Sequence, residues 1–135
     1  MTVLVSGIIP AGKSRAWVKK VAREAQEATK MAGDLAVVFV DSRRIAEINS
    51  RYRGHHEPTD ILSFESGEED DLGDIFICER AARVKAKARD EQFVDYLARL
   101  IVHGTLHLCG FDHLRPSEAE RMECLEEKVL KNLQK

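Results

Sequence analysis

Three of the five histidines in the chain lie within one short stretch, His103-Gly-Thr-Leu-His107-Leu-Cys-Gly110-Phe-Asp-His113. On a helix, residues four positions apart share a face, so His103 and His107 would direct their rings at a common point. Gly110 can take the left-handed backbone conformation that ends a helix, which would let the chain double back and bring His113 to that point. Three imidazoles leave the fourth position of a tetrahedral zinc open, as in catalytic zinc sites. We therefore predict one zinc ion per chain.

The same stretch has the HxxxHxxGxxH spacing of the metzincin proteases, whose signature is HExxHxxGxxH. The glutamate that acts as general base in that signature is replaced here by Gly104. Two interpretations of Gly104 stay open: close packing of the helix against a sheet, or space that admits a substrate over the metal. In either case the base of a protease mechanism is missing at its expected position. A buried histidine cluster without metal is the remaining alternative, and burial disfavours it because a protonated ring would be desolvated.

The elements that must position these histidines can be predicted from hydrophobic periodicity. Strands are expected within 2–9, 35–40, 61–64 and 72–78, and helices over 79–90 and 92–109, with three more that begin at Ser14, at Asp41 or Ser42, and at Ser117. Gly33 is expected to stop the first helix, and Ser117 with Glu120 has the spacing of a capping box.

The order of these elements predicts the topology. A strand, a helix and a strand at the start of the chain indicate a right-handed βαβ crossover with parallel strands. The short acidic loop between the last two strands favours an antiparallel pair. The prediction is an α+β (α/β-like) fold, a single domain over 1–135. Its four-stranded mixed sheet has three parallel strands and one antiparallel strand, packed with about five helices.

Length and composition agree with one globular domain. The 135 residues are 44% hydrophobic and 33% charged, which excludes a disordered or fibrous chain. Uncharged runs are too short to span a bilayer, and the first residues lack the features of a secretory signal, so we expect a cytoplasmic protein without a membrane partner. The three cysteines form no CxxC pair and are expected to be reduced thiols. Cys109 is expected to point away from the metal ligands.

Charge is distributed unevenly along the chain. Residues 54–79 hold nine acidic side chains and no lysine or arginine, whereas residues 1–53 hold ten basic and five acidic ones. This pattern indicates either ordinary solvated faces or a basic surface beside an acidic loop that orients a polyanion. Arg80, Arg83 and Lys87 share one face of a predicted helix and are candidates for following a phosphate backbone, with a solvated face as the alternative.

Four blocks of the sequence, in this order, resemble the YbeY family of bacterial endoribonucleases, which are also described as rRNA maturation factors. The blocks are Asn49-x-x-Tyr52-Arg53 leading into Pro58-Thr-Asp60-Ile-Leu-Ser-Phe64, then Leu72-Gly73-Asp74-Ile75, then His103 to His113, and then Glu118-Ala-Glu120-Arg-Met122 with Glu126 following. The resemblance runs from about residue 41 to 130, and the histidine block is its most specific part. One departure concerns Glu65, where the family usually has proline.

The resemblance implies a zinc-dependent, single-strand-specific endoribonuclease that acts in 3′-end maturation of the small-subunit (16S) rRNA and in ribosome quality control. It implies ribosomal RNA, the small ribosomal subunit with its proteins and an Era-type GTPase as partners. It assigns the metal to His103, His107 and His113, and it marks Arg53 as the functionally important arginine beside the site. His103 and Arg53 are therefore the predicted catalytic residues.

Several roles follow from the chemistry of the residues in these blocks. Arg53 would hold a phosphate bidentately and stabilise charge in the transition state. Asp112 and Asp74 are candidates for supporting the ligand rings through hydrogen bonds, with an exposed turn and a strand end as their respective alternatives. Asp60 is expected to cap a turn or to anchor the backbone.

Two other functions stay open. One is a non-catalytic, zinc-containing ribosome-assembly factor, and the other is a zinc hydrolase of another substrate class, such as a peptidase. Gly104 argues against the peptidase because glycine cannot transfer a proton. An open coordination position would favour catalysis, and a fourth protein ligand would favour a structural metal.

Overall fold

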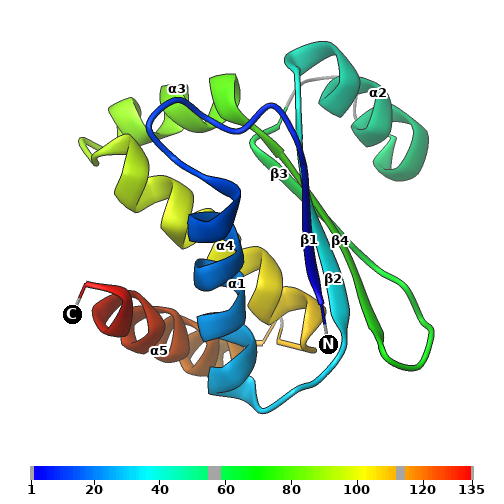
Figure 1. Ribbon diagram of the computed structural model, residues 1–135, viewed down its shortest axis with the longest axis vertical. Coiled ribbons are helices and arrows are strands. Elements are labelled where there is room, and N and C mark those ends of the chain that lie inside the picture. Colours follow the sequence, from blue (N-terminus) through cyan, green and yellow to red (C-terminus); the bar gives the residue numbers. More distant parts are fainter. Residues whose placement is uncertain (1, 55–58, 112–114, 135) are drawn as a thin grey trace.

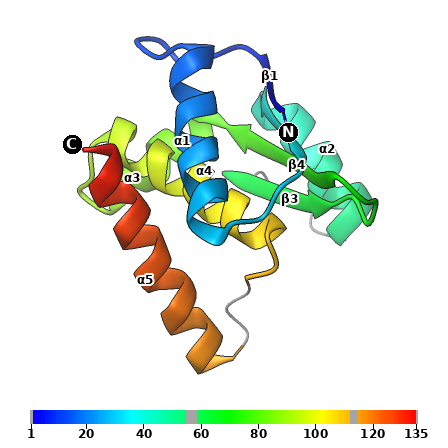
Figure 2. The same cartoon turned by 60° about the horizontal axis from the view of Figure 1, so that its bottom comes forward.

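A four-stranded sheet separates two unequal layers of helices in this computed structural model (Figure 1). The residues that the structure describes are 2–54, 59–111 and 115–134. The elements, in chain order, are β1 (Val3–Gly7), α1 (Arg15–Thr29), β2 (Asp34–Val40), α2 (Ser42–Arg53), β3 (Ile61–Glu65), β4 (Asp71–Cys78), α3 (Glu79–Ala88), α4 (Phe93–Leu108) and α5 (Pro116–Leu133). Helices α1, α4 and α5 lie on one side of the sheet and α2 lies on the other, as Figures 1 and 2 both show.

The strand order is β1-β2-β4-β3. Strands β1, β2 and β4 are parallel, and β3 is antiparallel to β4. The prediction of three parallel strands and one antiparallel strand is therefore confirmed. The last strand in the sequence, β4, lies inside the sheet, between β2 and β3. Its apolar residues on both faces suit it to that central position, because a strand covered on both sides needs apolar side chains on both sides.

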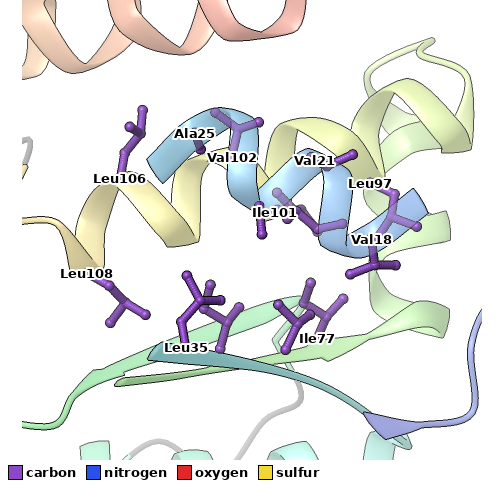
Figure 3. Packing of buried hydrophobic residues seen from close by; sticks show 14 of the residues in the cluster. Val18, Val21, Ala25, Leu35, Ile77, Leu97, Ile101, Val102, Leu106 and Leu108 are labelled. Carbon is purple, nitrogen blue, oxygen red and sulfur yellow. The ribbon is translucent and has the colours of Figure 1, made fainter. Parts of the chain in front are cut away.

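Alternation along β4 divides the core between the two faces of the sheet. Ile75 and Ile77 belong to the larger cluster, which includes residues of α1, α4 and α5. Cys78 belongs to a smaller cluster under α2, and Phe76 packs against that cluster. Figure 3 shows the larger cluster, in which side chains from α1 and α4 fill the space above the sheet. The position of α4 is therefore fixed by a wide apolar contact on its sheet-facing side.

Two predicted helix starts are confirmed by their caps. The Ser14 hydroxyl accepts a hydrogen bond from the Trp17 amide at 3.1 Å, and Asp41 accepts one from the Arg44 amide at 2.7 Å. In both cases the side chain satisfies an amide that has no partner within the helix.

The predicted end of α1 at Gly33 is wrong. The helix ends at Thr29, and Lys30 takes the left-handed conformation with φ 59°. The glycine serves close packing instead, because a Cβ at Gly33 would lie 2.9 Å from Cγ of Leu72. Its carbonyl also accepts a hydrogen bond from the buried side chain of Gln26 at 2.7 Å.

The predicted capping box at Ser117 and Glu120 is also wrong. Helix α5 begins one residue earlier, with Pro116 at its start, and Arg115 at the N-cap makes no side-chain cap. Proline is suited to the first helical position because the amide that it lacks would have no partner there. Among the helices that the structure describes, none is both long and apolar enough to cross a membrane.

Candidate functional site

Helix α4 carries the two predicted metal ligands that the structure describes. His103 and His107 lie one turn apart and are half-buried, while Leu97, Ile101 and Leu108 face the core. Residues four apart on a helix lie on one face, so the two imidazoles are neighbours. The sheet-facing contacts of α4 thus hold both rings in a fixed position relative to the sheet.

The end of α4 confirms the role predicted for Gly110. Gly110 has φ 98°, its amide donates to the His107 carbonyl at 3.1 Å, and the Phe111 amide donates to the Leu106 carbonyl at 3.1 Å. This pair of hydrogen bonds is the Schellman motif, which requires a left-handed residue and satisfies carbonyls of the last turn. The helix therefore ends at Leu108, one residue after the second histidine.

The structure decides between the two interpretations of Gly104. A Cβ at this position would lie 3.0 Å from Cδ1 of Ile61 and 3.2 Å from the Cδ1 and Cγ2 atoms of Ile75. Gly104 is buried and faces strands β3 and β4, so it allows close packing of the helix against the sheet. The alternative, a space for substrate above the metal, is wrong because the sheet already occupies that side of α4.

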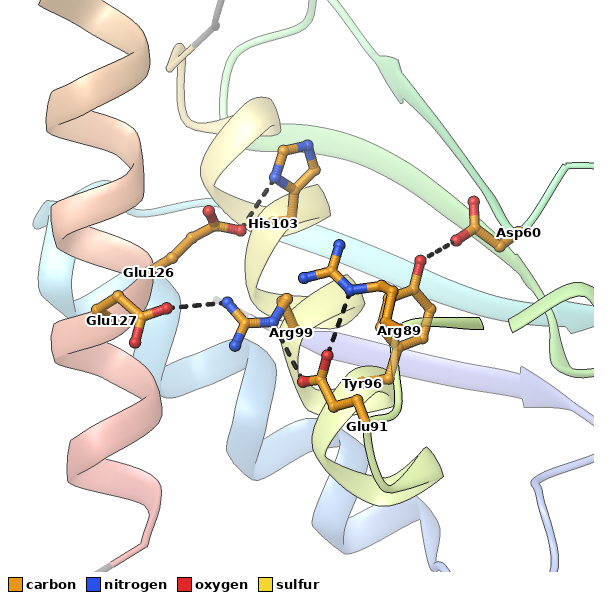
Figure 4. A network of polar contacts seen from close by, with 8 residues as sticks. All are labelled: Asp60, Arg89, Glu91, Tyr96, Arg99, His103, Glu126 and Glu127. Carbon is orange, nitrogen blue, oxygen red and sulfur yellow. Dashed lines mark hydrogen bonds and ion pairs between the residues drawn. The ribbon is translucent and has the colours of Figure 1, made fainter. Parts of the chain in front are cut away.

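His103 is held by a carboxylate from another helix. Its Nδ1 lies 3.0 Å from Oε1 of Glu126 on α5, and Figure 4 shows the second ring nitrogen on the side turned away from that carboxylate. A carboxylate only accepts hydrogen bonds, so this contact places the proton of a neutral imidazole on Nδ1 and the lone pair on Nε2. Metal-ligating histidines commonly have such a partner on the nitrogen that does not bind the metal.

The described part of this donor set fits a zinc ion. Neutral imidazole nitrogens suit zinc, and two of them at i and i+4 on one helix are a recurrent zinc-binding arrangement. The third predicted ligand, His113, lies outside the described residues, as does Asp112. Within the described ranges, no group of three or more His, Cys, Asp or Glu side chains is placed so that it could hold a metal.

A groove of about 440 Å³ lies beside His103, between α4, α5 and the C-terminal part of α3. Its polar lining consists of Asp60, Lys85, Arg89, Tyr96, Arg99, His103, Glu123 and Glu126. The lining contains both acidic and basic side chains, and several of them are joined in the network drawn in Figure 4. The groove is open to solvent and is wide enough for a small polar group to approach His103.

Asp60 forms one end of this network. Its side chain is buried, and Oδ2 accepts a hydrogen bond from the Tyr96 hydroxyl at 2.5 Å, while Nζ of Lys85 lies 3.7 Å from Oδ1. Its backbone carbonyl accepts a hydrogen bond from the Cys78 amide at 3.0 Å, which is a main-chain contact and does not test the role predicted for the Asp60 side chain. Burial raises the pKa of Tyr96, and the hydrogen bond to Asp60 raises it further.

Arg99 links α4 to two other segments. Its Nε lies 3.4 Å from Oε1 of Glu91, and its Nη1 lies 2.9 Å from Oε1 of Glu127 on α5. Nε of Arg89 lies 3.4 Å from the other oxygen of Glu91. The hydrogen bond to Glu127 raises the pKa of the Arg99 guanidinium, although partial burial opposes that shift. The cations beside His103 are therefore held in place by neighbouring carboxylates.

Two predicted residues lie away from this groove. Arg53 is the last residue of α2 and is exposed, and it is not among the described residues that line the groove. Asp74 alternates with Ile75 along β4, so it lies on the α2 side of the sheet, opposite to α4. Partial burial raises the pKa of the Asp74 carboxyl, and neighbouring Asp71 raises it further. The structure thus does not bring Asp74 to His103.

The basic residues predicted to bind RNA also border other depressions. Arg83 pairs with Glu79 at 2.8 Å, and its guanidinium lies 3.9 Å from the centre of the Phe93 ring. Arg83 and Lys87 line a shallow depression beside α3, and Arg80 borders a hollow between α2 and α3. None of the three is among the described residues that line the groove beside His103.

Sequence reasoning did not single out the groove's own cations. Lys85 lies on α3, Arg89 is the residue that directly follows this helix, and Arg99 comes from α4. Their i, i+4 spacing was a signal that Lys85 and Arg89 share a face, but nothing local indicated that this face lies beside His103. Glu126 belongs to one of the family's sequence blocks, but it lies 23 residues from the histidine that it contacts, so no local pattern links the two.

Comparisons with known proteins agree with this architecture. A family model described as "Endoribonuclease YbeY" matches residues 7–134. The chain is 39% identical over 117 residues to the Endoribonuclease YbeY of Rhizobium etli, covering 82% of this chain and 68% of that protein. It is 41% identical over 114 residues to the one of Methylocella silvestris, covering 80% and 65%. The chain thus spans about two thirds of the length of these relatives.

A solved structure extends the agreement to the fold. The solution structure of a protein from Thermotoga maritima superposes with a TM-score of 0.69 and 26% identity, over 99% of this chain and 92% of that one. The family match includes the histidine helix α4, its Gly110 terminus and the α5 carboxylate that contacts His103. With that match extending over nearly the whole sequence, the chain belongs to the YbeY family.

Proposed function

We propose that this chain is a zinc-dependent endoribonuclease that cleaves single-stranded ribosomal RNA. The observation that carries the proposal is the placement of His103 and His107 one turn apart on α4, with Nδ1 of His103 held by Glu126 beside an open groove. Membership of the YbeY family and the endoribonuclease name of the relatives support the same reaction class.

His103, His107 and His113 would hold the metal through neutral imidazole nitrogens. Zinc, when bound, polarises a phosphoryl oxygen and lowers the pKa of a water ligand towards about 7. Arg53 would hold a phosphate with its planar guanidinium and stabilise the charge that develops there. Asp112 remains a candidate for supporting the ligand rings through hydrogen bonds. Asp74 has no part in this proposal, because it lies on the face of the sheet opposite to α4. Gly104 faces the sheet and supplies no base, so a peptidase mechanism has no support at that position.

The proposed substrate is the 3′ end of the small-subunit (16S) rRNA, and the proposed roles are its maturation and ribosome quality control in the cytoplasm. The partners would be the small ribosomal subunit with its proteins and an Era-type GTPase. Arg80, Arg83 and Lys87 would contact backbone phosphates outside the groove. Exposed cations of this kind contribute affinity without sequence preference, so binding should weaken as salt rises.

The test uses the purified chain and a single-stranded RNA with the sequence of the small-subunit rRNA 3′ end, beside the same RNA in a duplex. We expect zinc close to one per chain by elemental analysis and cleavage of the single strand only. Chelation and His107→Ala should each abolish cleavage. A chain that binds zinc and assembled small subunits but never cleaves the RNA would instead be a non-catalytic assembly factor.

A further inference from the structure

We propose that Glu126 is a positioning residue for the metal centre: its carboxylate fixes the tautomer and the orientation of the His103 ring, so that Nε2 is the nitrogen presented to the metal. The inference rests on the proposed metal role of His103. It assigns a function to a residue of α5 that lies 23 positions further along the chain.

The first argument is the geometry of the contact. Nδ1 of His103 and Oε1 of Glu126 are 3.0 Å apart, a normal hydrogen-bond distance. The side chain of Glu126 is only 12% exposed, whereas that of His103 is 36% exposed. A carboxylate with so little access to water interacts more strongly with its partner than a surface carboxylate does. Most of the exposed surface of this pair therefore belongs to the imidazole.

The second argument is that packing aims the carboxylate. Met122 and Val129 are the buried residues of α5, and Glu126 lies four residues after the first and three before the second. Residues with these spacings share one helix face, so Glu126 lies on the face that packs against the rest of the molecule. The contact with His103 therefore follows from the packing of α5 against α4, and it does not depend on the rotamer of an exposed side chain.

The third argument is a second anchor that fixes the register of the same two helices. Arg99 lies one turn before His103 on α4, and Glu127 directly follows Glu126 on α5; their closest atoms are 2.9 Å apart. Two adjacent carboxylates thus bind two side chains that lie one turn apart. Only one of the two pairs contains a metal ligand, so the chain itself offers a matched control.

The effect expected from this arrangement is a gain in metal affinity. A carboxylate on Nδ1 makes the other nitrogen a better ligand and removes the need to orient the ring on binding. Loss of such a partner typically weakens metal binding by about 10–100-fold. The Arg99–Glu127 pair holds α5 to α4 in a similar way but should have no such effect.

The experiment measures zinc affinity by competition with a chromophoric chelator for the full chain and for Glu126→Gln, Glu126→Asp and Glu127→Gln. We expect a loss of about 10–100-fold for Glu126→Gln, partial recovery for Glu126→Asp, and wild-type affinity for Glu127→Gln. Long-range ¹H–¹⁵N correlation spectra of the metal-free wild type should show the His103 proton on Nδ1. Circular dichroism checks that each variant is folded.

The outcomes separate this inference from the proposed function. If the wild type and Glu126→Gln bind zinc with equal affinity, the positioning role is overturned and the metal function is left intact. Equal losses of zinc affinity in Glu126→Gln and Glu127→Gln would also overturn it, because both carboxylates would then act only by holding α5 against α4. A wild type that binds no zinc but carries the His103 proton on Nδ1 would overturn the metal function alone. A proton on Nε2 in the metal-free wild type would overturn the proposed tautomer.

Discussion

The hydroxyl of Tyr96 donates a 2.5 Å hydrogen bond to Oδ2 of Asp60, although the two residues are 36 positions apart in the sequence. Both side chains are buried, and the bond joins α4 to the residue that directly precedes β3. Both residues line the groove beside His103, so the bond holds two parts of its lining together. Because Asp60 is buried, its carboxylate depends on protein partners to replace the water that it has lost.

Tyr96→Phe should destabilise the fold by about 1–3 kcal/mol, since it leaves the Asp60 carboxylate with one hydrogen-bond donor fewer in a buried position. Chemical denaturation of the metal-free protein measures this change. Tyr52→Phe is the matched control, because Tyr52 is 65% exposed and its hydroxyl should contribute about 0.5 kcal/mol at most. Equal effects of the two substitutions would contradict a special role for the Tyr96 hydroxyl.

The same pair predicts a dependence on alkaline pH. The pKa of Tyr96 is raised above the ordinary value of 10.0, first by burial, so the folded state favours the neutral phenol. The contribution of this group is fully present below pH 10 and is lost as pH rises through the folded-state pKa. The difference in unfolding free energy between wild type and Tyr96→Phe should therefore shrink as pH is raised above 10. A constant difference up to pH 12 would contradict the assignment.

Gly104→Glu should destabilise the protein severely and create no peptidase activity. The new side chain would start 3.0 Å from Ile61 and 3.2 Å from Ile75, so a charged group would enter the apolar interface between α4 and the sheet. Gly104→Ala is the control: the gain in helix propensity of about 1 kcal/mol opposes the crowding, so its stability should stay within about 1 kcal/mol of wild type. A stable, folded Gly104→Glu protein in thermal denaturation would contradict this packing.

Arg53→Ala should reduce the rate of RNA cleavage by about 10²–10³ while zinc content stays at the wild-type value. The reason is that a contact made mainly in the transition state lowers turnover more than it lowers substrate affinity. Arg53→Lys should recover only part of the rate, because an ammonium lacks the planar fork. Arg51→Ala, in the same last turn of α2, is the control and should cleave normally. Equal losses in binding and cleavage would make Arg53 a docking residue.

Cys124 should be the one cysteine that iodoacetamide modifies quickly in the native protein. It is exposed, whereas Cys78 and Cys109 are buried. Burial also raises the pKa of the Cys109 thiol, which lowers the fraction of reactive thiolate. Mass spectrometry after brief labelling measures the site, with Cys124→Ser as the control that should take up almost no label. Rapid labelling of Cys109 in folded protein would contradict its burial.

Much of the fold could be predicted from the sequence because the signals involved are local. Hydrophobic repeats indicate the type of each element. The N-caps Ser14 and Asp41 and the glycine at 110 each act within one turn of the helix end that they stabilise. The mixed character of the sheet follows from connection lengths, since a short loop cannot join parallel neighbours. The i, i+4 histidine pair belongs to the same class of information. Even the local errors, at Gly33 and Ser117, concern only where a helix ends or begins.

The tertiary structure alone decided which distant faces meet. No local signal places β4 between β2 and β3, turns Gly104 towards Ile61, or brings Glu126 to His103 and Asp60 to Tyr96. These contacts depend on how apolar faces of separate elements are buried together, which is a property of the whole chain and not of any window within it. The sequence thus determined which imidazoles share a helix face, and the packing of α5 against α4 decided which ring nitrogen of His103 a carboxylate holds.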